Sequence, residues 1–135
     1  MTEGSWPPRT PYYNFLGLEA VERVDGRSLI RLPHKPELTN SRDEIHGGAQ
    51  ASLLDVALSQ AIRSVLPHGS KIATITLTTT HLAAGHGSLT AHGRVIRAGR
   101  SIATADGWIE GASGRKVATA LGTFRIWRTH HTDTS

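Results

Sequence analysis

The sequence predicts an α+β fold in which an antiparallel sheet is wrapped around one long buried helix. Its 135 residues suit a single domain. One segment, about residues 48–66, carries apolar side chains on nearly all sides of a helix, so this helix should be buried. From residue 72 onwards the apolar residues recur with a period of two, which indicates strands with one face on a core.

The N-terminal part of the chain predicts an arm and a hairpin. Residues 1–14 are rich in proline and aromatic residues, and we expect them to form an irregular arm. Two short strands at 18–24 and 27–32 should follow, joined by Asp25 and Gly26. An Asp-Gly pair between two apolar-bearing segments is a strong signal for a two-residue hairpin turn.

The C-terminal half predicts more strands. Pro67 and Gly69 should close the helix. Apolar residues and threonines alternate from Ile72 onwards, as in a strand with one buried face. Further strands are expected at 87–98, 101–111 and 115–127. The domain then covers residues 15–127, and residues 128–135 form a polar tail.

Composition excludes several classes of function. The chain has no cysteine, so disulfides, thiolate metal sites and a cysteine nucleophile are excluded. No signal peptide or membrane-length apolar run is visible, and we expect a cytoplasmic protein without a membrane partner. The net charge of +4 is scattered, so we expect no nucleic-acid partner. His81, His86 and His92 lack the spacing of a metal site, and no metal is expected.

Two glycines and one acidic residue mark the helix as a candidate site. Gly47 and Gly48 stand at its start, where first-turn N–H groups have no partners within the helix and could hold an anion or an oxyanion. The alternative is that they only let the loop turn into the helix. Asp55 lies mid-helix on a narrow polar stripe with Ser52 and Ser59. It is either a general base or nucleophile, or a structural anchor on an exposed stripe.

The spacing of these groups predicts a shared site. Gly47 and Asp55 are eight residues apart, which is about 12 Å at 1.5 Å per residue. A single reacting carbonyl needs both groups within about 3–4 Å. Two antiparallel copies related by a two-fold axis would bring Gly47 of one chain to the partner's Asp55. An active site would then lie between subunits, twice per dimer.

The run His46-Gly47-Gly48, followed by Asp55, resembles the hotdog-fold acyl-CoA thioesterases of the phenylacetate-degradation (PaaI-like) group. The similarity covers about residues 15–127. It also includes Asn40, the strand with Thr74, the turn Gly99-Arg100 and the closing Gly122-Thr123-Phe124.

The resemblance implies roles for these residues. The N–H of Gly47 would polarise the thioester carbonyl of an acyl-CoA, and the partner's Asp55 would activate water or attack directly. Asn40 and His46 would shape the site, and Thr74 would help to place the nucleophilic water. Coenzyme A would enter only as part of the substrate, with no other cofactor. A homodimer would form the site and pair again into a tetramer.

Substrate contacts and one departure complete the comparison with that group. We expect Gly48, Arg97, Gly99 and Arg100 to bind substrate, the arginines because paired guanidinium groups suit phosphate. Asp43 stands where a glycine is common in the group, and its charge could alter substrate choice.

Two other functions remain open. A hotdog hydratase or dehydratase would use a His with a carboxylate, and the helix offers no clear His partner for Asp55. A non-catalytic acyl-CoA-binding module could hold a carbonyl on the same N–H groups without turnover. The sequence does not identify the acyl group, which could be aryl or alkyl.

Overall fold

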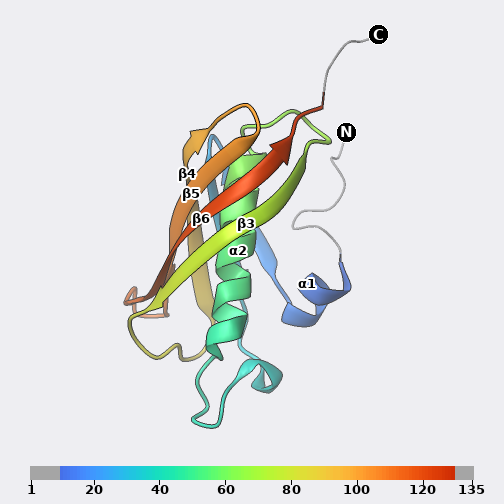
Figure 1. The fold of residues 1–135 in the computed structure, drawn as a ribbon. Helices are drawn as coiled ribbons and strands as arrows, with labels where there is room; N and C mark the ends of the chain where they lie inside the picture. Colours follow the sequence, from blue (N-terminus) through green and yellow to red (C-terminus); the bar gives the residue numbers. More distant parts are fainter. Residues whose placement is uncertain (1–9, 130–135) are drawn as a thin grey trace.

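The computed structural model describes residues 10–129 and has one antiparallel sheet curved around one long helix (Figure 1). The strand order is β1-β2-β4-β5-β6-β3, and every neighbouring pair is antiparallel. The expected hotdog architecture is confirmed. The elements are α1 (Pro11–Leu16), β1 (Glu19–Val24), β2 (Arg27–Leu32), the 3₁₀ helix η1 (Pro36–Leu38), α2 (Gly47–Arg63), β3 (Lys71–His81), β4 (Leu89–Ala98), β5 (Ile102–Glu110) and β6 (Lys116–Trp127).

The expectation of an irregular arm is wrong for its last residues, because α1 begins at Pro11. Thr10 caps this helix by accepting a hydrogen bond from the Tyr13 N–H at 3.2 Å, and proline suits the first helical position. Gly17 ends the helix in the left-handed conformation, with φ at 77°. Residues 1–9 of the expected arm, and residues 130–135 of the expected tail, lie outside the described residues.

The first hairpin is confirmed. Asp25 and Gly26 both have positive φ, 51° and 81°, as the tight turn between β1 and β2 requires. The Gly26 N–H donates to Ser64 Oγ at 2.7 Å, just beyond the C-terminus of α2. This hairpin therefore lies at the C-terminal end of the long helix.

Helix α2 ends three residues earlier than expected. The N–H groups of Val65 and Leu66 donate to the carbonyls three residues before them, so the chain tightens after Arg63. Val65, which lies inside the expected helix, is 41% exposed. Apolar residues in the middle of the helix are buried as expected, with Leu53 and Ala57 fully inaccessible.

Glycines on the inner face of the sheet set how closely α2 approaches. A Cβ on Gly93 would lie 2.3 Å from the Ala57 carbonyl oxygen, and one on Gly107 would lie 2.7 Å from Leu58 Cδ1. The Ser28 hydroxyl donates to the same Ala57 carbonyl at 2.6 Å. The middle of α2 is therefore held against β2, β4 and β5, which fixes the position of its polar stripe.

The two edges of the sheet are β1 and β3. Strand β3 has a register shift between Thr74 and Thr76, and the intervening Ile75 is 52% exposed. Helix α1 lies beside the N-terminal half of α2, where Tyr12 contacts Ser52 (Figure 1). Within residues 10–129, no helix combines the length and apolar character that crossing a lipid bilayer requires.

Candidate active site

At the start of α2, the N–H groups of Gly47 and Gly48 differ in their hydrogen bonding. His46 is the N-cap, and its Nδ1 accepts a hydrogen bond from the Gly48 N–H at 2.7 Å. The Gly48 N–H is therefore satisfied by the capping side chain, and the exposed Gly48 backbone lines a groove. The Gly47 N–H has no acceptor among residues 10–129. It remains available to a carbonyl oxygen, and the positive end of the helix dipole reinforces it.

Asn40 builds the loop that leads into the helix. Its Oδ1 accepts hydrogen bonds from the backbone N–H groups of Arg42 and Glu44, at 2.9 and 3.1 Å. Its side-chain amide, together with Arg42, lowers the pKa of the Glu44 carboxyl. Asn40 thus fixes the conformation of the loop, and its side-chain oxygen is occupied by backbone N–H groups of that loop.

Asp43 has a conformational explanation. It adopts φ of 60°, the left-handed region that glycine enters without cost and that Asp tolerates better than most residues. Its side chain is exposed in the loop. A glycine would adopt this backbone conformation without strain.

Gln50 and His81 lie beside Gly47 at the start of the helix, and the sequence did not predict this pair. Gln50 is 3% exposed; its Nε2 donates to the Ile45 carbonyl at 3.0 Å, and its Oε1 lies 3.1 Å from His81 Nδ1. Because that oxygen can only accept, His81 Nδ1 carries the proton. The His81 ring approaches Gly47, where a Cβ would lie 3.6 Å from Nε2. This leaves Nε2 directed at the site.

A polar groove of about 340 Å³ lies at this position, and Asn40, Gly47, Gln50 and His81 are among its lining residues. Little in the sequence indicated that these residues share a groove, because His81 lies 34 positions after Gly47 and the two meet only when β3 pairs with β6.

Asp55 and Thr74 form the second part of the site. Thr74 Oγ1, on the inner face of β3, donates to Asp55 Oδ1 at 2.7 Å. Burial raises the pKa of Asp55, and the Thr74 hydrogen bond opposes part of that rise. Asp55 is the only acidic residue of α2 and is half-buried. It can therefore act as a base with one oxygen fixed and the other free for a water molecule.

Helix α1 closes over this polar stripe. Tyr12 Oη donates to Ser52 Oγ at 2.6 Å, and Ser52 Oγ donates to the Gly48 carbonyl at 3.0 Å. Burial, and next the charge of Asp55, raises the pKa of Tyr13. Tyr13 therefore lies close enough to Asp55 to sense its ionisation.

The remaining expected residues lie at the other end of the helix. Gly99 forms the turn between β4 and β5, where its N–H donates to the Ile102 carbonyl at 2.9 Å, and Arg97 and Arg100 are exposed beside it. This turn follows Val95, which packs near Gly26 and Val65 beyond the C-terminus of α2. Within one chain, these residues and Gly47 do not come together.

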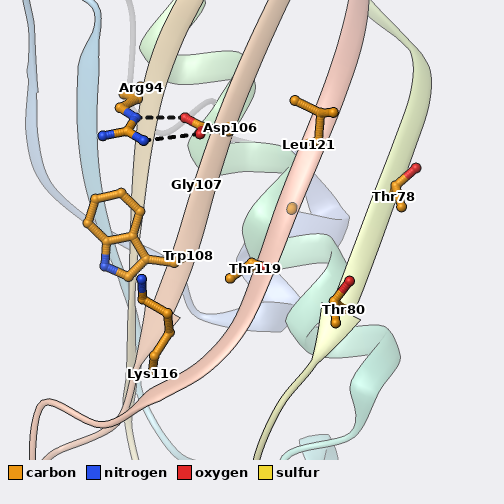
Figure 2. Close-up of a pocket in the computed structure, with 10 residues that line it drawn as sticks. Thr78, Thr80, Arg94, Asp106, Gly107, Trp108, Lys116, Thr119 and Leu121 are labelled. Atoms are coloured by element: carbon orange, nitrogen blue, oxygen red, sulfur yellow. Dashed lines mark hydrogen bonds and ion pairs between the residues drawn. The ribbon is translucent and has the colours of Figure 1, made fainter.

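A second hollow, of about 380 Å³, lies on the outer face of the sheet (Figure 2). Arg94 forms two hydrogen bonds with Asp106, at 2.8 and 3.2 Å, and Lys116 Nζ lies 5.2 Å from the Trp108 ring centroid. The Trp108 ring is also stacked on His92, with the ring centroids 4.7 Å apart. Figure 2 shows the Arg94–Asp106 pair above Trp108, so the Arg94 charge is already neutralised within the protein.

Histidines and acidic residues do not assemble a metal site in the part of the chain that the structure describes. His81 and His92 lie on opposite faces of the sheet, each with its own hydrogen-bond partner.

Comparison with known proteins agrees with this geometry. A Halobacterium salinarum protein classed with the esterases is 32% identical, covering 85% of this chain and 83% of that protein. A Bacillus halodurans protein solved with CoA is 31% identical, with a TM-score of 0.82, over 90% of this chain and 82% of that one. A conserved Pseudomonas aeruginosa protein is 28% identical, with a TM-score of 0.84, over 88% of this chain and 95% of that one.

A match to a family model identifies the family itself. Residues 44–118, more than half of the chain, match the model of the thioesterase superfamily and include the start of α2, Asp55 and Thr74. The chain therefore belongs to the thioesterase superfamily of hotdog-fold thioester hydrolases.

Proposed function

We propose that this protein hydrolyses acyl-CoA thioesters at a site shared between two subunits. The observation that carries the proposal is the presence of an amide donor and a half-buried carboxylate on one helix. Gly47 has an N–H without an acceptor among residues 10–129, and Asp55 has a half-buried carboxylate held by Thr74. They are separated by about 12 Å along α2, so one chain cannot bring both to one carbonyl.

A two-fold dimer would solve this separation. Strand β3 is a free edge with unpaired backbone groups, and antiparallel pairing of two β3 strands would continue the sheet. The two α2 helices would then run antiparallel, with each Gly47 near the partner's Asp55. The same operation would carry Arg97 and Arg100 to the partner's Gly47 end, where they could bind CoA phosphates. The Bacillus halodurans relative, solved with CoA, supports this substrate class.

Further pairing of dimers into a tetramer is part of the proposal. Apolar side chains on the outer face of the sheet remain exposed in a single chain, and they favour an additional protein contact. These residues are Ile96, Leu121 and Trp127.

The reaction uses few groups. The thioester carbonyl oxygen accepts a hydrogen bond from the Gly47 N–H, which stabilises the oxyanion as it forms. The partner's Asp55 removes a proton from a water molecule, whose oxygen bonds to the carbonyl carbon, or attacks that carbon itself. Thr74 holds Oδ1 of the carboxylate, so Oδ2 faces the reacting atoms. After attack by water, the C–S bond breaks and the proton held by Asp55 passes to the sulfur, which gives a carboxylic acid and CoA thiol. After direct attack, breakage of the C–S bond leaves a mixed anhydride on Asp55, which water hydrolyses to the carboxylic acid, and the CoA thiolate takes a proton from solvent.

Subunit complementation tests the shared site. Asp55→Asn keeps the acceptor for Thr74 but removes the base, and Gly47→Pro removes only the amide donor. Each purified variant should be inactive. After the two are mixed, unfolded and refolded together, half of the dimers would be heterodimers with one intact site, so about one quarter of wild-type thiol release should return.

Two results would overturn the shared site. Mixed variants that stay inactive, while co-refolded wild type regains activity, would exclude two-chain catalysis. A strictly monomeric active protein would do the same.

One observation favours a second candidate, an acyl-thioester hydratase. His81 Nε2 beside Gly47 supplies the imidazole that the helix lacks, and it would face the partner's Asp55 across the same carbonyl. Loss of an enoyl-CoA double bond without thiol release would select this function. Thiol release from saturated acyl-CoA would select the hydrolase.

A further inference from the structure

An open apolar groove of about 310 Å³ lies between α1 and the start of α2. Tyr12 and Phe15 form one wall, and Ala49 and the Gly48 backbone form the other. Leu16 and Leu38 lie at its base and are buried in the core. The groove therefore begins one residue from the unpaired Gly47 amide.

The aromatic wall is held in place but left open. Tyr12 is fixed to α2 through Ser52, and Lys35 donates to the Phe15 carbonyl while its Nζ lies 4.2 Å from the ring centroid. Even so, Tyr12 is 52% exposed and Phe15 is 50% exposed. Large apolar side chains that remain half exposed around a concave surface are typical of a binding site.

Two grooves of different chemistry flank Gly47. The groove with Asn40, Gln50 and His81 is polar, whereas the groove beside α1 is apolar. A thioester carbonyl carries two unlike substituents, an acyl group and the sulfur arm of CoA, and an amide-bound carbonyl would direct one toward each groove. We propose that the groove between α1 and α2 binds the acyl group, an inference that rests on the function proposed above.

The groove also indicates the class of acyl group. A closed cavity of about 150 Å³ holds benzene, so about 310 Å³ accommodates a ring with a short linker or a medium alkyl chain. Glu37 stands at the rim, and its carboxylate would repel an acyl group that ends in a second carboxylate. The substrate is therefore an uncharged acyl or aryl-acyl thioester that is larger than acetyl.

A substrate series on the full-length protein tests the groove. Wild type should hydrolyse hexanoyl-CoA and phenylacetyl-CoA with kcat/KM at least about tenfold above acetyl-CoA, because each buried methylene contributes about tenfold or more. In Phe15→Ala this ratio should fall by about tenfold. In Val21→Ala, which shortens a similarly exposed apolar side chain on the edge strand β1, the ratio should not change.

A charge reversal keeps the test independent of α1 folding. Glu37→Lys changes an exposed side chain and should raise kcat/KM for succinyl-CoA, relative to hexanoyl-CoA, by about fivefold or more. Glu22→Lys makes the same change on the exposed edge strand β1 and should leave the ratio unaltered.

Binding of ketone analogues, in which CH₂ replaces the thioester sulfur, separates the two proposals. The affinity of the wild type should rise from the acetyl to the hexanoyl analogue, and Phe15→Ala should abolish this rise. That result supports binding of the acyl group in the groove even if no acyl-CoA is hydrolysed. The opposite result is hydrolysis in which Phe15→Ala does not change the chain-length ratio and Glu37→Lys does not change the succinyl-CoA ratio. That result would refute the assignment of the groove to the acyl group but would leave the proposed hydrolase activity supported.

Discussion

Gly47→Pro should separate the oxyanion donor from every other property of the helix. Proline lacks the N–H, and in this structure that N–H has no acceptor among residues 10–129, so no internal hydrogen bond is lost. Gly47 is the first helical residue, the position that proline favours. His46 has φ of −56° and ψ of 139°, which is the extended conformation required before a proline. The substitution should therefore leave folding intact.

The expected effect on rate is large. Loss of one oxyanion donor costs about 10²–10³-fold in kcat. Gly47→Ala is the matched control, because it retains the N–H and its Cβ would meet His81 Cε1 at 3.5 Å, an ordinary contact. It should lose less than about tenfold. Thiol release from hexanoyl-CoA measures the rate, and urea unfolding checks stability.

Either of two outcomes would refute this assignment. Gly47→Pro could keep kcat within a few-fold of wild type while remaining folded, in which case the amide does not bind the oxyanion. Alternatively, Gly47→Ala could lose as much as Gly47→Pro, and crowding against His81 would then explain both variants.

Three further variants test the remaining geometry. Asp55→Asn should lower kcat by about 10²–10⁴-fold. Because burial raises the pKa of Asp55, the stability of the wild type should fall as the pH rises from the unfolded-state pKa of Asp55 through its folded-state pKa. The Asn variant should therefore be more stable than wild type at neutral pH but not at about pH 3.5, and an equal difference at both pH values would contradict this. Gly107→Ala places a Cβ 2.2 Å from the His92 carbonyl oxygen and should lower the free energy of unfolding in urea by about 3 kcal/mol. Gly111→Ala, whose Cβ would meet only Val117 Cγ2 at 3.7 Å, should leave stability nearly unchanged, and similar unfolding midpoints for the two variants would disprove the close packing. Gln50→Leu leaves the Ile45 carbonyl and His81 Nδ1 without the partners that Gln50 provides, which should lower the free energy of unfolding by about 1–3 kcal/mol and reduce kcat/KM. Unchanged kinetics would show that the orientation of His81 does not matter.

Local patterns were sufficient for the long helix, the strands and half of the candidate site. Asp25-Gly26 predicted its hairpin because the turn depends on two residues with positive φ. The segment with apolar residues on nearly all sides predicted a buried helix. Asp55 was a candidate because a carboxylate is rarely buried in such a helix without a partner. The spacing of Gly47 and Asp55 also predicted that one chain cannot complete the site, because the helical rise is constant.

Long-range contacts were beyond the sequence. His46 takes the Gly48 N–H, Thr74 meets Asp55, and His81 reaches Gly47 only after the strands have paired in one particular register. Short-range periodicity reports which face of an element is buried, but not which residue of a distant element lies opposite. For that reason the amide left free for substrate, the histidine beside it and the apolar groove under α1 were decided by tertiary structure alone.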